Sequence, residues 1–230
     1  MKLEVCVDSY SSILTAKRAG ADRIELCSAL NLGGLTPSYG LMKQVKNVNE
    51  IEVFVMIRPR SGDFLYDENE FETMKLDILN VKQMEFAGIV TGILLSNGKI
   101  DIKRMEELII LARPLKVVLH RAFDDAFNPI DDIDKLIELG VCRILTSGQK
   151  ANALEGASNI AEMQKRFGDK ITIMPGCGVN KENIKKIYQI TKCTEYHMSG
   201  REESGRADYN FIKGARDVLD YLIKKEYLNS

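Results

Sequence analysis

The sequence predicts a single α/β domain over residues 1–230, folded as a closed (β/α)₈ barrel, or TIM barrel, with a parallel sheet. Two observations predict this class. Short apolar runs rich in Val and Ile alternate with longer amphipathic segments, as expected of strands buried on both faces and helices that cover them. The alternation occurs eight times, at about 29 residues per unit, and no linker or low-complexity tract interrupts it.

Eight segments are too short for helices and are rich in β-branched residues, so each predicts a strand. Helical connections between them require the strands to run parallel, with the helices on the outside. In chain order the predicted strands are Leu3–Val7, Arg23–Cys27, Glu52–Ile57, Gly88–Leu94, Lys116–Arg121, Cys142–Thr146, Ile171–Met174 and Glu195–Met198.

Capping signals predict where several of the intervening helices begin. Thr36-Pro37 and Asn128-Pro129 each place a capping side chain before a proline at the first helical position. Asn69 with Glu72 resembles a capping box. An open doubly wound sheet is the alternative fold, but no G-x-G-x-x-G motif follows the first predicted strand.

Composition and charge argue against several classes of partner. Hydrophobic residues make up 45% of the chain, charged residues 28%, and the formal net charge is −1. We therefore expect no nucleic-acid partner. No apolar run approaches the roughly 20 residues that span a bilayer, and the first residues predict a strand rather than a secretory signal, so we expect no membrane association. The five scattered cysteines indicate reduced thiols and a cytoplasmic location.

Polar side chains gather where the predicted strands end. In a (β/α)₈ barrel the loops that follow the strands carry the chemistry, whereas the strands and the opposite loops provide stability. We therefore expect the functional site at the C-terminal ends of the strands. The segments concerned are Gly33–Ser38, Arg58–Phe64, His120–Asp124, Thr146–Gln149, Pro175–Val179 and His197–Arg201.

The chain contains two histidines, and both lie near the end of a predicted strand. His120 belongs to the fifth strand and His197 to the eighth. One interpretation is general acid–base catalysis or metal ligation, because imidazole titrates near neutral pH and binds metals through either ring nitrogen. The other is that both are core histidines hydrogen-bonded to the backbone.

Two glutamates lie inside short predicted strands, where both faces of the sheet are dry. Strand side chains alternate, so Glu4 shares a face with Cys6, and Glu25 shares a face with Cys27. An unpaired carboxylate in either environment is unfavourable, so a cationic partner or a ligand is required. The alternatives are a structural ion pair and a carboxylate whose shifted pKa suits acid–base chemistry. The arginine candidates are Arg23, Arg58 and Arg121.

Glycine-rich loops after the last two predicted strands indicate either a phosphate site or tight turns alone. Gly176, Gly178, Ser199 and Gly200 occupy the position where many barrels bind phosphate through backbone N–H groups. On this pattern we expect a small anionic ligand at that end of the barrel.

Two cysteines close neighbouring predicted strands. Such strands lie about 4.8 Å apart, so the sulfurs of Cys6 and Cys27 could approach each other. A pair of thiolates would suit Cu(I), whereas plain packing in the core is the alternative.

Together these segments resemble the CutC family, the copper homeostasis proteins. The match runs in order over nearly the whole chain, and it departs from the family pattern at Ser61, where members often have glycine. The matching stretches are Leu3–Val7, Ala21–Cys27, Gly33–Ser38, Ile57–Phe64, His120–Asp124, Leu145–Gly148, Gly176–Val179 and His197–Ser199.

The resemblance implies a TIM barrel, a cytoplasmic location and assembly into a homo-oligomer, either a dimer or a tetramer. It also implies a role in copper homeostasis, with Cu(I) as the cofactor at the cysteines that match the family pattern, Cys6 and Cys27.

An enzyme is the alternative function, because a metal carrier needs few of the polar residues found at so many strand ends. It would be of aldolase, isomerase or hydrolase type and would act on a small phosphorylated metabolite. The motifs place no lysine at a strand end, which argues against a Schiff base. The catalytic candidates are Glu25, Arg58, His120, Arg121 and His197, and the phosphate-binding candidates are Gly176, Gly178, Ser199 and Gly200.

Overall fold

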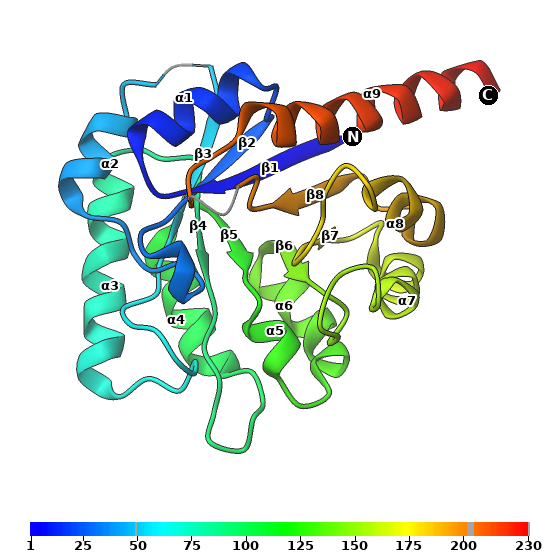
Figure 1. The fold of residues 1–230 in the computed structure, drawn as a ribbon. Coiled ribbons are helices and arrows are strands. Elements are labelled where there is room, and N and C mark those ends of the chain that lie inside the picture. The colour runs from blue at the N-terminus through cyan, green and yellow to red at the C-terminus, as the bar shows by residue number, and fades with distance from the viewer. Residues whose placement is uncertain (49, 202–204, 230) are drawn as a thin grey trace.

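The computed structural model describes residues 1–48, 50–201 and 205–229. In this part of the chain eight parallel strands form one sheet in the order β7-β6-β5-β4-β3-β2-β1-β8. Figure 1 shows the strands around a central space, with helices outside them. The strands are β1 (Lys2–Val7), β2 (Arg23–Leu26), β3 (Glu52–Met56), β4 (Gly88–Thr91), β5 (Lys116–Leu119), β6 (Val141–Thr146), β7 (Thr172–Pro175) and β8 (Glu195–Met198).

The connections between strands are mostly helical, as the sequence predicts. The α-helices are α1 (Tyr10–Arg18), α2 (Tyr39–Val45), α3 (Glu68–Gln83), α4 (Ile102–Ala112), α5 (Ala122–Asp125), α6 (Ile133–Leu139), α7 (Ala157–Phe167), α8 (Ile184–Thr191) and α9 (Tyr209–Asn229). Two 3₁₀-helices, η1 (Leu30–Leu32) and η2 (Pro129–Asp132), add short turns.

The barrel is nearly closed. Strand β1 pairs with β8 in parallel, and β7 lies beside β8, although the described residues form no β-ladder between those two strands. The predicted parallel (β/α)₈ architecture is therefore confirmed. Several strands are shorter than predicted, and as a result Cys27, His120 and Arg121 lie just beyond the ends of their strands.

The predicted starts of α2 and α3 are wrong by two residues. The Ser38 hydroxyl caps α2 by accepting from the Leu41 N–H group at 3.2 Å. A capping box of Asp67 and Glu70 begins α3. In α3 a similar pair, Asn69 and Glu72, follows Asp67 and Glu70 by two positions, so the local pattern alone cannot tell which of the two pairs begins the helix. An ion pair from Arg60 to Glu70 favours the earlier pair.

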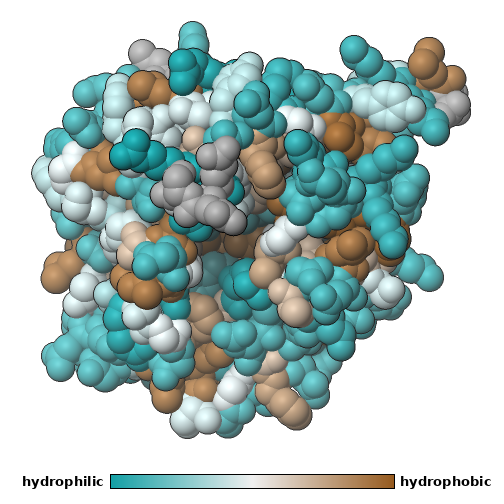
Figure 2. All heavy atoms as spheres, viewed as in Figure 1, coloured by the Kyte–Doolittle hydropathy of each residue, from teal (hydrophilic) through white to brown (hydrophobic). Residues whose placement is uncertain are grey.

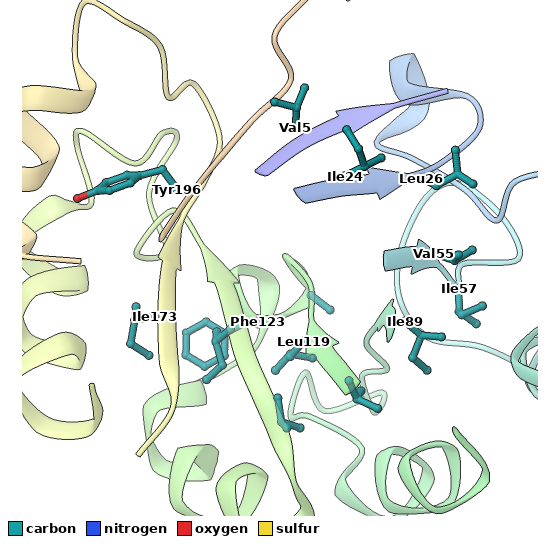
Figure 3. Close-up of a cluster of buried hydrophobic side chains, with 14 of the residues drawn as sticks. Val5, Ile24, Leu26, Val55, Ile57, Ile89, Leu119, Phe123, Ile173 and Tyr196 are labelled. Carbon is teal, nitrogen blue, oxygen red and sulfur yellow. The ribbon is translucent and has the colours of Figure 1, made fainter. Parts of the chain in front are cut away.

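Apolar side chains from the outer face of the strands, together with Phe123 of α5, belong to the main core. Figure 3 shows them between the ring of strands and the helices. Each is almost completely buried, which stabilises the fold by roughly 1.5–3 kcal/mol per large side chain. Those labelled are Val5, Ile24, Leu26, Val55, Ile57, Ile89, Leu119, Phe123, Ile173 and Tyr196.

The final helix is tied to the strand ends opposite the cavity described below. Arg216 of α9 donates to Asp22 at 2.7 Å, and the same carboxylate accepts the N–H group of Leu3 at 2.7 Å. Beyond this anchor α9 projects past the barrel, as Figure 1 shows. No helix within the described residues is long and apolar enough to cross a membrane.

An aromatic ring and an ionic cluster fill the lower interior of the barrel. The Phe54 ring has the guanidinium of Arg23 5.5 Å from its centroid and that of Arg143 at 5.3 Å. Both arginines donate to Glu195, at 2.6 and 2.7 Å. Gly88 is the cross-strand partner of Phe54, and a Cβ atom there would lie 2.3 Å from the ring. This layer closes the barrel interior beneath the site described below.

We predict that Gly88→Ala lowers the free energy of unfolding by about 1–3 kcal/mol, because the new methyl group must displace Phe54. Gly40→Ala is the matched control, since nothing lies within 4 Å of that position and it is helical. The control should stabilise by up to about 1 kcal/mol. Urea denaturation of the three proteins measures both effects. Equal stability of Gly88→Ala and the parent would contradict this packing.

Candidate active site

A cavity of about 440 Å³ lies at the C-terminal ends of the strands. It brings together eight residues that the sequence predicts for a site, namely Cys6, Glu25, Arg58, His120, Arg121, Gly178, His197 and Ser199. Figure 2 shows a recess near the centre of the viewed face, inside the ring of strands. Strand ends from all around the barrel therefore contribute to one shared opening.

The two strand glutamates point into the barrel, and Glu4 is fully paired. Its Oε1 accepts from His197 Nδ1 at 2.8 Å, and Oε2 pairs with Arg23. The register of β1 with its two parallel neighbours produces both contacts, because Glu4 lies opposite Arg23 of β2 on one side and opposite His197 of β8 on the other. Burial raises the pKa of Glu4, but the bond from His197 and the charge of Arg23 outweigh it and lower the pKa to about 2. Glu4 is therefore a carboxylate.

Glu25 is buried beside His197 and forms no ion pair with an arginine among the described residues. The distance between His197 Nε2 and Glu25 Oε2 is 3.8 Å. Burial raises the pKa of Glu25. Burial lowers the pKa of His197, but the charge of Glu25 and the bonds to Cys6 and Glu4 raise it well above its ordinary value. Glu25 Oε1 is buried and has no hydrogen-bond partner among the described residues.

The two predicted copper ligands lie in different environments. Cys6 lines the cavity, whereas Cys27 is fully buried and does not line it. The Cys27 thiol donates to Glu25 Oε2 at 3.5 Å, and burial together with the charge of Glu25 raises its pKa well above the ordinary value. The thiol of Cys6 instead groups with the carboxylate of Glu25 and the imidazole of His197, with the three ligand atoms within 4.8 Å of one another.

His120 lines the cavity with a neutral imidazole ring. Its Nδ1 accepts from the N–H group of Ala122 at 3.1 Å, which leaves the proton of the neutral ring on Nε2. Burial and the charge of Arg58 lower the pKa of His120 to about 3. Nε2 is buried without a partner in the described part of the chain. A Cβ atom at Gly92 would lie 2.7 Å from the ring, so that glycine makes room for it.

The two candidate arginines differ in how far their guanidinium groups are buried and engaged in hydrogen bonds. Arg58 donates to the carbonyls of Leu32, Gly34 and Gly62 at 3.0, 3.2 and 2.7 Å, so it clamps the loops after β2 and β3 together. Arg121 bonds to Asp124 at 2.9 Å and stays 41% exposed. Of the two, Arg121 is better placed to approach an anion.

The four predicted phosphate-binding residues separate into two pairs. Gly178 and Ser199 line the cavity, whereas Gly176 and Gly200 are not among its lining residues. A Cβ atom at Gly176 would lie 2.3 Å from Leu145, and one at Gly200 would lie 2.5 Å from Ile212. Close packing therefore accounts for the second pair.

Sequence reasoning did not single out several residues of the site. Gly92 makes room for His120, and apolar side chains supply part of the cavity wall. For the apolar wall residues, a hydrophobic residue within or next to a polar loop was the available sequence signal. For Gly92 the sequence carries no such signal, because a glycine inside a predicted strand does not reveal what packs against it. Besides the predicted Cys6, four apolar or sulfur-bearing lining residues lie outside the predicted loop segments, namely Leu30, Leu32, Met56 and Leu145.

Comparison with solved structures supports the fold and the family. CutC from Streptococcus agalactiae matches with a TM-score of 0.82 and 35% identity, covering 86% of this chain and 98% of that chain. Phosphoribosyl anthranilate isomerase from Thermotoga maritima matches with a TM-score of 0.64 and 11% identity, over 96% of this chain and 98% of that one. At that identity the second likeness shows the barrel fold alone.

Curated relatives and the family model agree with this. Family protein CutC from Glaesserella parasuis is 45% identical over 201 residues, 87% of this chain and 83% of the relative. The human copper homeostasis protein cutC homolog is 46% identical over 199 residues, 86% of this chain and 73% of the relative. The CutC family model matches residues 1–202. The resemblance predicted from the sequence is therefore confirmed, and the chain belongs to the CutC family, whose members include copper homeostasis protein homologues.

Proposed function

We propose that the barrel mouth binds a small anionic metabolite and that the protein is an enzyme acting on it. One observation carries the proposal. Two buried polar atoms, Glu25 Oε1 and His120 Nε2, lack partners within the described residues, and both residues line the same cavity. An unsatisfied buried polar group costs about 1–3 kcal/mol, so such groups call for a ligand that completes their hydrogen bonds.

The two unpartnered atoms differ in kind. His120 Nε2–H is a donor that keeps its proton across the physiological pH range, so it can stabilise negative charge that develops on a ligand oxygen. Glu25 Oε1 is an acceptor. A fixed donor and a carboxylate in one cavity suit proton transfer next to a carbonyl group, as in an isomerase or aldolase. Gly178 and Ser199, on the cavity wall, support a phosphate group on the metabolite.

Cu(I) binding is the second candidate, favoured by the names of the relatives and by the cavity thiol of Cys6. The residues present fit a two-thiolate Cu(I) site poorly, because Cys27 is a buried thiol bonded to Glu25 with a raised pKa. Titration of the reduced protein with Cu(I) against a competing chelator tests this candidate. Unchanged affinity in a Cys6→Ser, Cys27→Ser double variant would exclude it.

We also propose a cytoplasmic location and a homo-oligomeric state, a dimer or a tetramer. All five cysteines are free thiols, which supports a reducing compartment. The oligomeric state is an expectation from the family resemblance, and light scattering of the full chain measures it.

We predict that a phosphorylated metabolite stabilises the protein against unfolding and that His120→Asn reduces this stabilisation. At 1 mM, a ligand of micromolar affinity should add about 4 kcal/mol to the free energy of unfolding. The Asn carboxamide can still accept from Ala122 but reaches less far into the cavity, so affinity should fall roughly 10–100-fold. Thermal-shift screening with sugar phosphates makes the measurement. The absence of a thermal shift with any member of a broad panel of sugar phosphates would contradict phosphate recognition.

We predict that, because of His120, the free energy of unfolding decreases as the pH falls. Its pKa is about 3 in the folded protein and about 6.5 when unfolded. Below about pH 6.5 the unfolded chain therefore takes up a proton that the folded chain does not, and stability decreases down to about pH 3. Relative to His120→Asn, wild type should lose about 2 kcal/mol between pH 7 and pH 5. Urea denaturation at each pH tests this, and parallel curves for the two proteins would refute it.

A further inference from the structure

We propose that Cys6, Glu25 and His197 form a binding site for a divalent transition-metal ion of the Zn²⁺ class, open on one side to the cavity. The Cys6 sulfur, a Glu25 carboxylate oxygen and a His197 ring nitrogen all lie within 4.8 Å of one another. All three residues are buried, and all three line the cavity. Three protein ligands with a fourth position facing a cavity is the arrangement of catalytic zinc sites.

Rigid strands hold the three ligands. Cys6 of β1 is in register with Glu25 of β2, and on the other side Val5 of β1 is in register with Met198, the residue after His197 in β8. The 3.8 Å between His197 Nε2 and Glu25 Oε2 is close to the roughly 3.4 Å that separates two ligands about 2.1 Å from a tetrahedral ion. Small side-chain rotations would therefore complete the coordination without moving the backbone.

The histidine is oriented as metal-binding histidines are. His197 Nδ1 donates to Glu4 at 2.8 Å, which leaves Nε2 on the side of Glu25. Arg23 holds Glu4 in turn. A carboxylate on the outer nitrogen fixes the ring and strengthens its inner nitrogen as a ligand. Glu25 Oε1, buried without a partner in the described structure, is a second and independent sign that a cation or ligand belongs here.

The donor set favours Zn²⁺ over Cu(I). One thiolate, one imidazole and one carboxylate are the ligand types that Zn²⁺ accepts together, whereas Cu(I) selects soft sulfur donors. The second thiol, Cys27, is not in the group of three and is hydrogen-bonded to Glu25 instead. Cys6 and Glu25 would bring two negative charges, which match the charge of a divalent ion.

The inference deepens the proposed function, because the open metal position faces the cavity assigned to the anionic metabolite. The two fail separately, however. Metal binding is read without any metabolite, and His120→Asn, which weakens metabolite binding, should leave metal affinity unchanged.

Co²⁺ added to the chelator-treated full-length protein tests the site, because a thiolate ligand gives a near-ultraviolet charge-transfer band and tetrahedral Co²⁺ gives intense visible bands. Zn²⁺ should displace Co²⁺ and remove both. We expect Cys6→Ser, Glu25→Gln and His197→Asn each to weaken binding at least about 100-fold. Glu4→Gln, which removes the carboxylate that orients His197 and also pairs with Arg23, should weaken metal binding about 10–100-fold.

Cys27→Ser is the decisive control, since it removes the neighbouring thiol but no proposed ligand. It should keep the charge-transfer band and a Zn²⁺ affinity within about threefold of wild type. The proposal is overturned if wild type shows no such band, or if Cys27→Ser abolishes it. Both of these readings remain decisive even if a ligand variant fails to fold, which circular dichroism would show.

Discussion

A carboxylate buried inside a strand must be neutralised, and the way this barrel neutralises Glu4 determines the geometry of its site. Arg23 and His197 approach Glu4 from the two neighbouring strands. One ion cluster therefore joins β2, β1 and β8, where the first strand of the barrel pairs with the last. The same contact orients the His197 ring and directs Nε2 toward Glu25, which places polar side chains beside the apolar ones of the barrel interior. Breaking a buried pair of this kind by removing one partner typically costs 3–5 kcal/mol, so stability and site geometry depend on a single interaction.

The rest of the cavity is organised by loops rather than by strands. Arg58 holds two loops together through backbone carbonyls, and its guanidinium lies 4.8 Å from the centroid of the Phe64 ring. That ring in turn lies 4.7 Å from the ring of His120. Burial, helped by the charge of Arg58, lowers the pKa of His120 and keeps the imidazole neutral. The two histidines of the chain therefore have opposite characters in one cavity, a charged ring at His197 and a neutral donor at His120, and environment alone separates them.

Much of this arrangement follows from the sequence, because it depends on alternation and on the direction of parallel strands. Alternation places Glu4 with Cys6, and parallel strands bring Glu25, Arg58, His120 and His197 to one opening. What the sequence leaves open is register and depth. Whether His197 meets Glu4 depends on the stagger of strands that are 193 residues apart. Likewise, Cys27 shares a face with Glu25 as alternation predicts, but its thiol bonds to Glu25 and does not belong to the group that Cys6 forms with Glu25 and His197.

The central claim is that fixed partners give the two imidazoles different protonation states, and nitrogen NMR of ¹⁵N-histidine-labelled protein in the metal-free state measures this directly. With two histidines in the chain, the signals can be assigned by substituting one residue. Near neutral pH we expect His197 to be protonated on both nitrogens, and His120 to be neutral with its proton on Nε2. If both rings instead titrate together near pH 6.5 with mixed tautomers, the buried contacts described here do not control the site.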